Sequence, residues 1–197
     1  MATIVACRAV VAARIHAPAH EERLLRRLRV LGMSHRMMID EPQTLARAAG
    51  ESGLDADALV EWMRDDRVER AMRDDMAAAR SPSPAALAMR ERLAQTPEGV
   101  WRYTCPSWEM TAAGARIDAP GFQPARVYEV ALANLAPDVD LRPTPDDVTQ
   151  VLAWAPYPLA TVEVAAICEI PPTEARRQLT STATEHPIAG DAYWDLS

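Results

Sequence analysis

The chain has 197 residues, of which 49% are hydrophobic and 25% are charged, a composition typical of a soluble globular protein of one domain or one domain with an appendage. Its formal net charge of -7 argues against broad, non-specific attraction to nucleic acid or to an anionic membrane. No apolar run approaches the roughly 18 residues that span a bilayer, and Arg8 and Arg14 interrupt the apolar N-terminal residues where a signal peptide would need its core. We therefore expect a cytoplasmic protein with no membrane partner.

The cysteines do not suggest a metal site or a disulfide framework. Cys7, Cys105 and Cys168 are odd in number and far apart in the sequence. The histidines before residue 40 have no cysteine or carboxylate at metal-ligand spacing. The sequence therefore predicts neither a metal nor a cofactor.

The first eighty residues are predicted to be helical. Residues 5–31 predict one or two helices that break near Pro18 and present a leucine face on one side. Arginines fill much of the other side, and we interpret them as a solvated face rather than a site for a polyanion.

Acidic residues mark where the next helices begin. Asp40 is expected to cap a helix with Pro42 in its first turn, and Asp55 is expected to cap the helix after it. Asp65 or Asp66 opens a third helix, whose predicted core face repeats every three or four residues. The members of that face are Val68, Met72, Met76 and Ala79.

Ser83 followed by Pro84 predicts a further helix that runs to about Ala94. From Val100 the pattern changes to alternation with period two, which predicts a strand that continues through Met110. Residues 112–114 predict a turn and residues 116–118 a returning strand, so we expect a β-hairpin. A helix should begin at residues 123–124, with an inward face made of Val127, Tyr128, Ala131, Leu132 and Leu135.

Residues 137–143 are polar and rich in proline, and we place a linker there between a first unit at 1–136 and a second at 144–197. The second unit predicts three helices and a terminal strand at 193–196, an arrangement that is winged-helix-like. It carries eight acidic residues against two arginines, Arg176 and Arg177, so we do not expect it to bind nucleic acid. Packing against protein is the better prediction.

Four stretches carry a resemblance to a known family. Thr104-Cys105-Pro106-Ser107 lies between two β-forming segments, and residues 120–124 lead into the last helix of the first unit. Residues 6–10 and 24–28 are rich in alanine, leucine and arginine. Over residues 5–136 the chain resembles the helical insertion and second half of the thioredoxin fold in bacterial DsbA-like proteins, relatives of dithiol-disulfide isomerases and kappa-class glutathione transferases.

The resemblance implies a fold, a loop and an activity. The fold is mostly α with a small β-hairpin (α+β), followed by the winged-helix-like unit. The loop would hold a cis peptide bond before Pro106, with Cys105 as the candidate catalytic thiol and Thr104, Cys105 and Pro106 as the substrate-binding residues. The activity implied is that of a thiol-disulfide oxidoreductase, with a peptide or thiol as ligand.

The chain departs from the family in one large respect. A complete member begins with a strand and a Cys-x-x-Cys or Ser variant at a helix N-terminus, where the helix dipole stabilises a thiolate. This chain contains no Cys-x-x-Cys. We therefore expect a catalytically incomplete protein, whether from truncation, a misassigned start or reliance on a partner, and a homodimer through the sheet edge or C-terminal unit is one prediction.

Two alternatives stay open. Cys105 is either a functional thiol in a groove or a small buried residue of a strand. The whole chain is either a DsbA-like oxidoreductase homologue or a non-enzymatic helical interaction or regulatory protein that engages a partner through its C-terminal unit.

Overall fold

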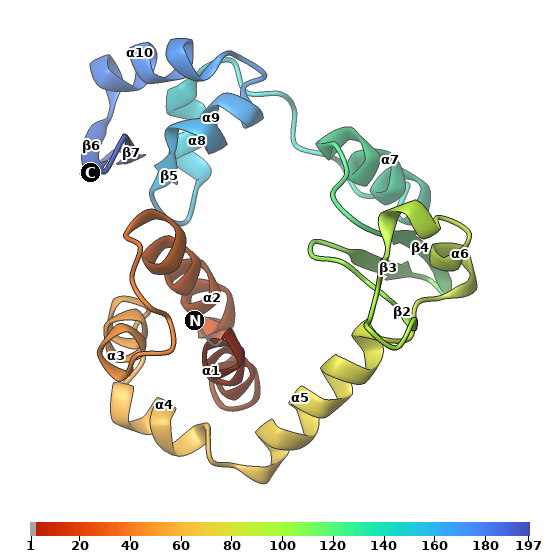
Figure 1. Cartoon of the computed structure of the whole chain (residues 1–197). Helices are drawn as coiled ribbons and strands as arrows, with labels where there is room; N and C mark the ends of the chain where they lie inside the picture. The colour runs from red at the N-terminus through yellow and green to blue at the C-terminus, as the bar shows by residue number, and fades with distance from the viewer. Residues whose placement is uncertain (1–2) are drawn as a thin grey trace.

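The computed structural model describes residues 3–197 (Figure 1). Of the chain, 54% is helical and 13% lies in strands, which confirms a mostly α-helical α+β protein with small sheets. Figure 1 shows three groups of elements: a helical body at residues 3–79, a hairpin unit at 80–136 and a C-terminal unit at 144–197. Within residues 3–197, no helix is both long enough and apolar enough to cross a membrane.

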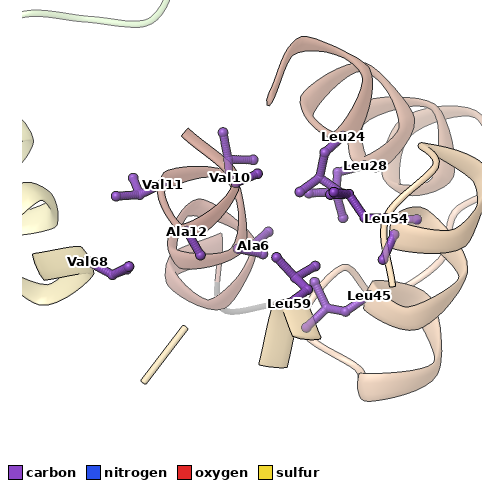
Figure 2. Packing of buried hydrophobic residues seen from close by; sticks show 14 of the residues in the cluster. Ala6, Val10, Val11, Ala12, Leu24, Leu28, Leu45, Leu54, Leu59 and Val68 are labelled. Atoms are coloured by element: carbon purple, nitrogen blue, oxygen red, sulfur yellow. The ribbon is translucent and has the colours of Figure 1, made fainter. Parts of the chain in front are cut away.

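The helical body holds the N-terminal helices, and the chain breaks near Pro18 as predicted. Its members are α1 (Thr3–His16), a 3-10 turn η1 (Pro18–His20), α2 (Glu21–Arg29), a wider π-type turn η2 (Val30–Ser34), α3 (Pro42–Glu51), α4 (Ala56–Trp62) and α5 (Asp66–Ala79). Alanines on α1 are fully buried, and their small side chains let α2, α4 and α5 approach this central helix closely. Figure 2 shows the leucines of the neighbouring helices that complete this core, among them Leu24, Leu45 and Leu59.

Two of the three predicted helix caps form. The carboxylates of Asp55 and Asp65 each accept a hydrogen bond from a backbone N–H in the first turn of α4 and α5. The prediction for Asp40 is wrong. Because Pro42 takes the first helical position and pushes the preceding residue to an extended conformation, Glu41 is the N-cap of α3, and its side chain makes no capping hydrogen bond.

The predicted core face of α5 is correct only in its first half. Val68 and Met72 are buried against α1, whereas Met76 is 39% exposed and Ala79 is exposed. Figure 1 shows that α5 runs away from the helical body toward the hairpin unit. Within the described residues, the buried cluster of the helical body includes no residue of α5 after Met72.

The hairpin unit contains shorter helices than the sequence predicted. Its elements are α6 (Pro84–Leu87), a 3-10 turn η3 (Arg90–Arg92), β1 (Ala94–Gln95), β2 (Trp101–Arg102), β3 (Trp108–Ala112), β4 (Ala115–Ala119) and α7 (Ala125–Leu135). The helix expected to reach Ala94 ends at Leu87, because Ala94 and Gln95 pair antiparallel with β2 instead. The expected continuous strand from Val100 to Met110 is likewise broken, into β2 and β3, by the loop that contains Pro106.

The predicted β-hairpin is present. β3 and β4 pair antiparallel, with Met110 opposite Ile117. Ala113 and Gly114 connect them with φ angles of 48° and 81°, the two positive values of a tight hairpin turn.

One face of α7 differs from the prediction. Ala131 and Leu135 are buried, but Val127 and Leu132 are 40% and 45% exposed. The two-stranded hairpin covers only part of this helix, and the two clusters of buried hydrophobic residues found within 3–197 include no residue from 80–136. The hairpin unit thus has little core of its own.

The C-terminal unit has a compact core around Trp194. Its elements are α8 (Val148–Trp154), β5 (Leu159–Ala160), α9 (Thr161–Ile167), α10 (Pro172–Thr182), β6 (Thr184–Ile188) and β7 (Asp191–Asp195). The strand order is β5-β7-β6, all antiparallel, with three helices beside the sheet. The sequence predicted the helices and β7 but not the strands β5 and β6.

The C-terminal unit docks on the helical body through α2. Arg26 donates two hydrogen bonds to the carboxylate of Glu163, one of them at 2.6 Å, and a third to the carbonyl of Pro158 at 3.3 Å. The hydroxyls of Ser34 and Tyr193 lie 2.7 Å apart. The chain therefore returns to its own N-terminal helices, as Figure 1 shows.

Candidate functional site

The cysteine–proline loop comprises residues 103–107 and joins β2 to β3. At its start, the backbone N–H of Tyr103 donates to the carbonyl of Ala79 at 2.9 Å, which ties the loop to the end of α5. The Tyr103 hydroxyl donates to Glu109 at 3.0 Å. These contacts fix one end of the loop against the helical body.

Hydrogen bonds from Ser107 and Thr104 hold the centre of the loop. The Ser107 hydroxyl donates to the carbonyl of Thr104 at 2.6 Å and accepts from the backbone N–H of Gly121 at 2.9 Å. The Thr104 hydroxyl donates to the carbonyl of Arg92 at 3.0 Å. The peptide bond between Cys105 and Pro106 is cis, the geometry that the family resemblance implies.

Cys105 is exposed, so the alternative of a buried strand cysteine is wrong. The reason is that β2 ends at Arg102 and leaves Cys105 in the loop rather than in a strand. Within the described residues, neither the backbone N–H nor the carbonyl of Cys105 makes a hydrogen bond. Both groups are free to pair with an extended ligand.

A shallow pocket of about 240 Å³ lies beside the loop. Thr104 and Cys105 line it together with Ser107, Tyr103 and Glu109. Pro106, the third predicted site residue, is exposed next to Cys105 but does not line the pocket. The structure therefore brings together two of the three predicted residues and adds Ser107.

The pocket is not built to stabilise a thiolate. None of the side chains that line it in the described part of the chain is basic, and the carboxylate of Glu109 is paired with Arg116 at 2.5 Å. A low-pKa cysteine normally has a cation or a helix N-terminus beside it. Neither a cation nor a helix N-terminus is among the described residues that line the pocket beside Cys105.

Ser107 and Gly121 lie in the stretches that carry the family resemblance, but the sequence did not predict that they hold the loop. Gly121 has a φ of 70°, and a Cβ atom there would lie 3.0 Å from the carbonyl oxygen of Arg92 and 3.5 Å from the Thr104 hydroxyl oxygen. The Pro120-Gly121 dipeptide was the available signal, because such pairs mark turns with special backbone angles. Its role as a support for a loop fourteen residues earlier could not be read from it.

Gly121→Ala should destabilise the hairpin unit by about 2–3 kcal/mol, since alanine is strained at positive φ and its methyl group meets the Arg92 carbonyl. Urea unfolding followed by circular dichroism measures the change. Gly114→Ala is the matched control: its φ is 81°, but nothing lies within 4 Å of its Cβ position, so only about 1 kcal/mol is expected. Equal losses for the two variants would contradict the close packing of Gly121.

The other two cysteines lie outside this loop. Cys7 is exposed on α1, and the buried face of that helix is formed by its neighbours Ala6 and Ala9. Cys168 is half-buried at the end of α9, and burial, assisted by Asp147, raises the pKa of its thiol. All three cysteines are free thiols, and within residues 3–197 no group of three or more His, Cys, Asp or Glu side chains could hold a metal ion.

A comparison with protein families found a match that covers the helical body. A family model described as the DSBA-like thioredoxin domain matches residues 2–83. Over these residues the chain is similar to that family. The resemblance stated from the sequence is thus confirmed over α1 to α5, while the hairpin unit and its loop follow the matched residues. A search of curated proteins found no match to the chain.

The last residue of the DSBA-like segment lies against the cysteine–proline loop. The segment ends at Ser83, whose backbone N–H donates a hydrogen bond to the Tyr103 hydroxyl oxygen at 3.1 Å. Its hydroxyl bonds to Asp118 on β4. The last residue of the matched segment therefore contacts both the loop and the hairpin.

Proposed function

We propose that the chain is a thiol-disulfide oxidoreductase homologue that binds an extended peptide or thiol ligand at the Cys105 loop and does not turn over disulfides on its own. The DSBA-like segment supports the oxidoreductase-like class. The binding role and the catalytic incompleteness are our inference from the loop.

One observation carries the proposal: Cys105 is exposed beside a pocket, and its backbone N–H and carbonyl are unused within the described residues. An extended peptide recognises such a pair of groups by adding strand-like hydrogen bonds. The pocket would then take one side chain of the peptide. While the hairpin unit is closed, hydrogen bonds from Ser107 to Gly121 and from Thr104 to Arg92 hold the loop in this conformation.

The chemistry available to Cys105 is a single exchange step. Its thiolate attacks one sulfur of a disulfide, a new disulfide forms between Cys105 and that sulfur, and the other half leaves as a thiolate that takes up a proton. Release of the adduct requires a second thiol. With no Cys-x-x-Cys in the chain, that thiol would come from another molecule, such as the reduced form of the ligand.

A peptide activated as its 2-thiopyridyl disulfide tests this proposal. We expect Cys105 to form the mixed disulfide at least tenfold faster than Cys7 or Cys168, with one equivalent of 2-thiopyridone released, as mass spectrometry and absorbance would record. Cys105→Ser should abolish the fast phase. An unchanged fast phase in that variant would refute binding at the loop, and steady reduction of insulin disulfides with dithiothreitol, beyond the uncatalysed rate, would refute catalytic incompleteness.

A pair of α5 variants separates ligand binding from thiol reactivity. Ala78 lines the pocket and is exposed, so Ala78→Phe should fill the pocket and slow capture of the peptide while leaving the reaction with a small reagent such as iodoacetamide unchanged. Ala77→Phe is the control, since Ala77 is exposed on the same helix but does not line the pocket. If both variants slow peptide capture equally, the pocket is not the binding site.

A second candidate function rests on the C-terminal unit. This unit has its own core and docks on α2, which supports a role as an interaction module rather than as part of a catalytic centre. On α10, Arg176 pairs with Glu185 and Asp191, and Arg177 pairs with Glu174. We propose that these internal pairs leave α10 without free positive charge for nucleic acid, so that the unit engages protein. A homodimer stays a prediction.

A further inference from the structure

A groove of about 570 Å³ lies where the C-terminal unit meets α2, well separated in the fold from the Cys105 loop. The helical body contributes its basic wall, which includes Arg23, Arg26, Arg27 and His35. The C-terminal unit contributes a largely apolar wall of Pro156, Tyr157, Pro158, Pro187, Ile188 and Tyr193. A volume of this size suits a small molecule.

The basic wall keeps an excess of positive charge after its own ion pairs are counted. Arg26 is held by Glu163, while Glu51 is shared between Arg27 and Arg47, the latter at 2.8 Å. The three arginines of the wall and Arg47, which shares Glu51 but does not line the groove, thus have two carboxylates among them. This excess is local, because the chain as a whole carries a net charge of -7.

Among the arginines that line the groove, Arg23 is the one without a partner in the described part of the chain. It is exposed on α2 and makes no ion pair or hydrogen bond with any residue in the range 3–197. Its neighbour Arg26 donates hydrogen bonds to the Glu163 carboxylate and to the carbonyl of Pro158. The guanidinium carbon of Arg26 also lies 4.8 Å from the centre of the Tyr157 ring and 5.7 Å from that of Tyr193. Arg26 therefore shapes the groove, and Arg23 is available to a ligand.

The positive charges of the basic wall also act on His35. Burial lowers the pKa of its imidazole, and the nearby Arg27 and Arg47 lower it further against the opposing effect of Glu51. The imidazole is therefore neutral at pH 7 and can serve as a hydrogen-bond partner without adding charge. On the opposite side of the groove, His186 is paired with Asp195 at 2.9 Å.

We propose that this groove binds a small organic anion, with its carboxylate or phosphate on Arg23 and its apolar body against the proline and tyrosine side chains of the C-terminal unit. Charge-assisted hydrogen bonds to a planar guanidinium suit both kinds of oxyanion. Contact with the apolar wall would add to the binding energy of the ligand. A ligand in this position would contact both the helical body and the C-terminal unit. The site is independent of Cys105.

Calorimetric titration of the whole chain with four probes tests the proposal. The probes are 3-phenylpropionate, phenyl phosphate, the neutral analogue 3-phenylpropan-1-ol, and inorganic phosphate. We expect at least one of the two aromatic anions to bind with 1:1 stoichiometry, and to bind at least tenfold more tightly than both the neutral alcohol and inorganic phosphate. The tighter of the two aromatic anions identifies the carboxylate or the phosphate as the preferred head group.

Two arginine variants locate the site. Arg23→Ala should weaken the aromatic anion at least tenfold, whereas Arg29→Ala should change its affinity less than twofold, because Arg29 is exposed on the same helix and does not line the groove. Cys105→Ser should leave the affinity unchanged, which separates this site from the proposed function of the loop. Equal binding of the neutral alcohol, absence of binding by both aromatic anions, or equal losses in the two arginine variants would overturn the proposal.

Discussion

Trp194→Ala is expected to lower the free energy of unfolding of the C-terminal unit by about 3–5 kcal/mol. The indole of Trp194 is fully buried, and its N–H donates to the Thr161 hydroxyl at 2.8 Å. That hydroxyl in turn donates to Asp191 at 2.5 Å, while Arg176 lies 5.6 Å from the indole ring centre. Alanine would leave a large void and would remove the donor from which the Thr161 hydroxyl accepts, a loss that is a large fraction of the stability of a small domain.

Urea unfolding followed by far-ultraviolet circular dichroism measures this loss. Trp154→Ala is the matched control in the same unit, because Trp154 is 39% exposed and packs against the guanidinium of Arg142; a loss below about 1 kcal/mol is expected. Thr161→Val gives an intermediate variant that keeps the volume but removes the hydroxyl, with an expected loss of about 1–3 kcal/mol. If the two tryptophan variants were equally stable, the core would not be organised around Trp194.

Arg26→Met is expected to undock the C-terminal unit from the helical body, with a loss of about 1–3 kcal/mol. The ion pair with Glu163 is only partly shielded, since the two side chains are 21% and 33% exposed, so the loss is smaller than for a fully buried pair. The variant also removes the hydrogen bond to Pro158 and the stacking on Tyr157. Small-angle scattering would record the undocking as a larger radius of gyration.

The same contact should depend on pH. Burial acts to raise the pKa of Glu163, but the hydrogen bonds from Arg26 and from the backbone N–H of Ala160 outweigh it and hold the pKa below its ordinary value of 4.5. A carboxyl with a lowered folded pKa stabilises the docked state above pH 4.5, and that contribution is lost as the pH falls through the folded value. The wild-type chain should therefore undock in acid, and Glu163→Gln should remove this pH dependence.

A double-mutant cycle separates the ion pair from the other contacts of Arg26. If Arg26→Met and Glu163→Gln are additive, the docking rests on the tyrosines and not on the ion pair. Arg29→Met is the control on the same helix, because Arg29 is exposed and has no partner within residues 3–197. Its effect should stay within about 0.5 kcal/mol.

The sequence predicted most helices of the fold because their signals are local. Asp55 and Asp65 cap helices by contacting residues two or three positions away, and the Ala113-Gly114 turn needs only its own backbone angles. Predictions failed where distant residues decide the outcome. Ala94 leaves its predicted helix because it pairs with Arg102, a preference that no pattern around Ala94 contains.

In the candidate site, too, features set by neighbouring residues could be predicted, and features set by distant residues could not. Thr104, Cys105 and Pro106 could be identified from a short motif, and the cis bond accompanies that motif. The contacts of Ser107 with Gly121 and of Thr104 with Arg92 span at least twelve positions of sequence and could not be predicted. The exposure of Cys105 likewise depends on where β2 ends, which its alternating pattern did not define.

The scarcity of buried side chains in the hairpin unit has a consequence for ligand binding. Segments with few buried apolar contacts open locally at a smaller free-energy cost than the cores beside them. Along the sequence the Cys105 loop lies between the two buried clusters and belongs to neither, so its amides should exchange with solvent while the helical body and the C-terminal unit remain protected. A peptide that binds there must suppress this opening, and part of its binding energy is consumed in ordering the hairpin rather than appearing as affinity.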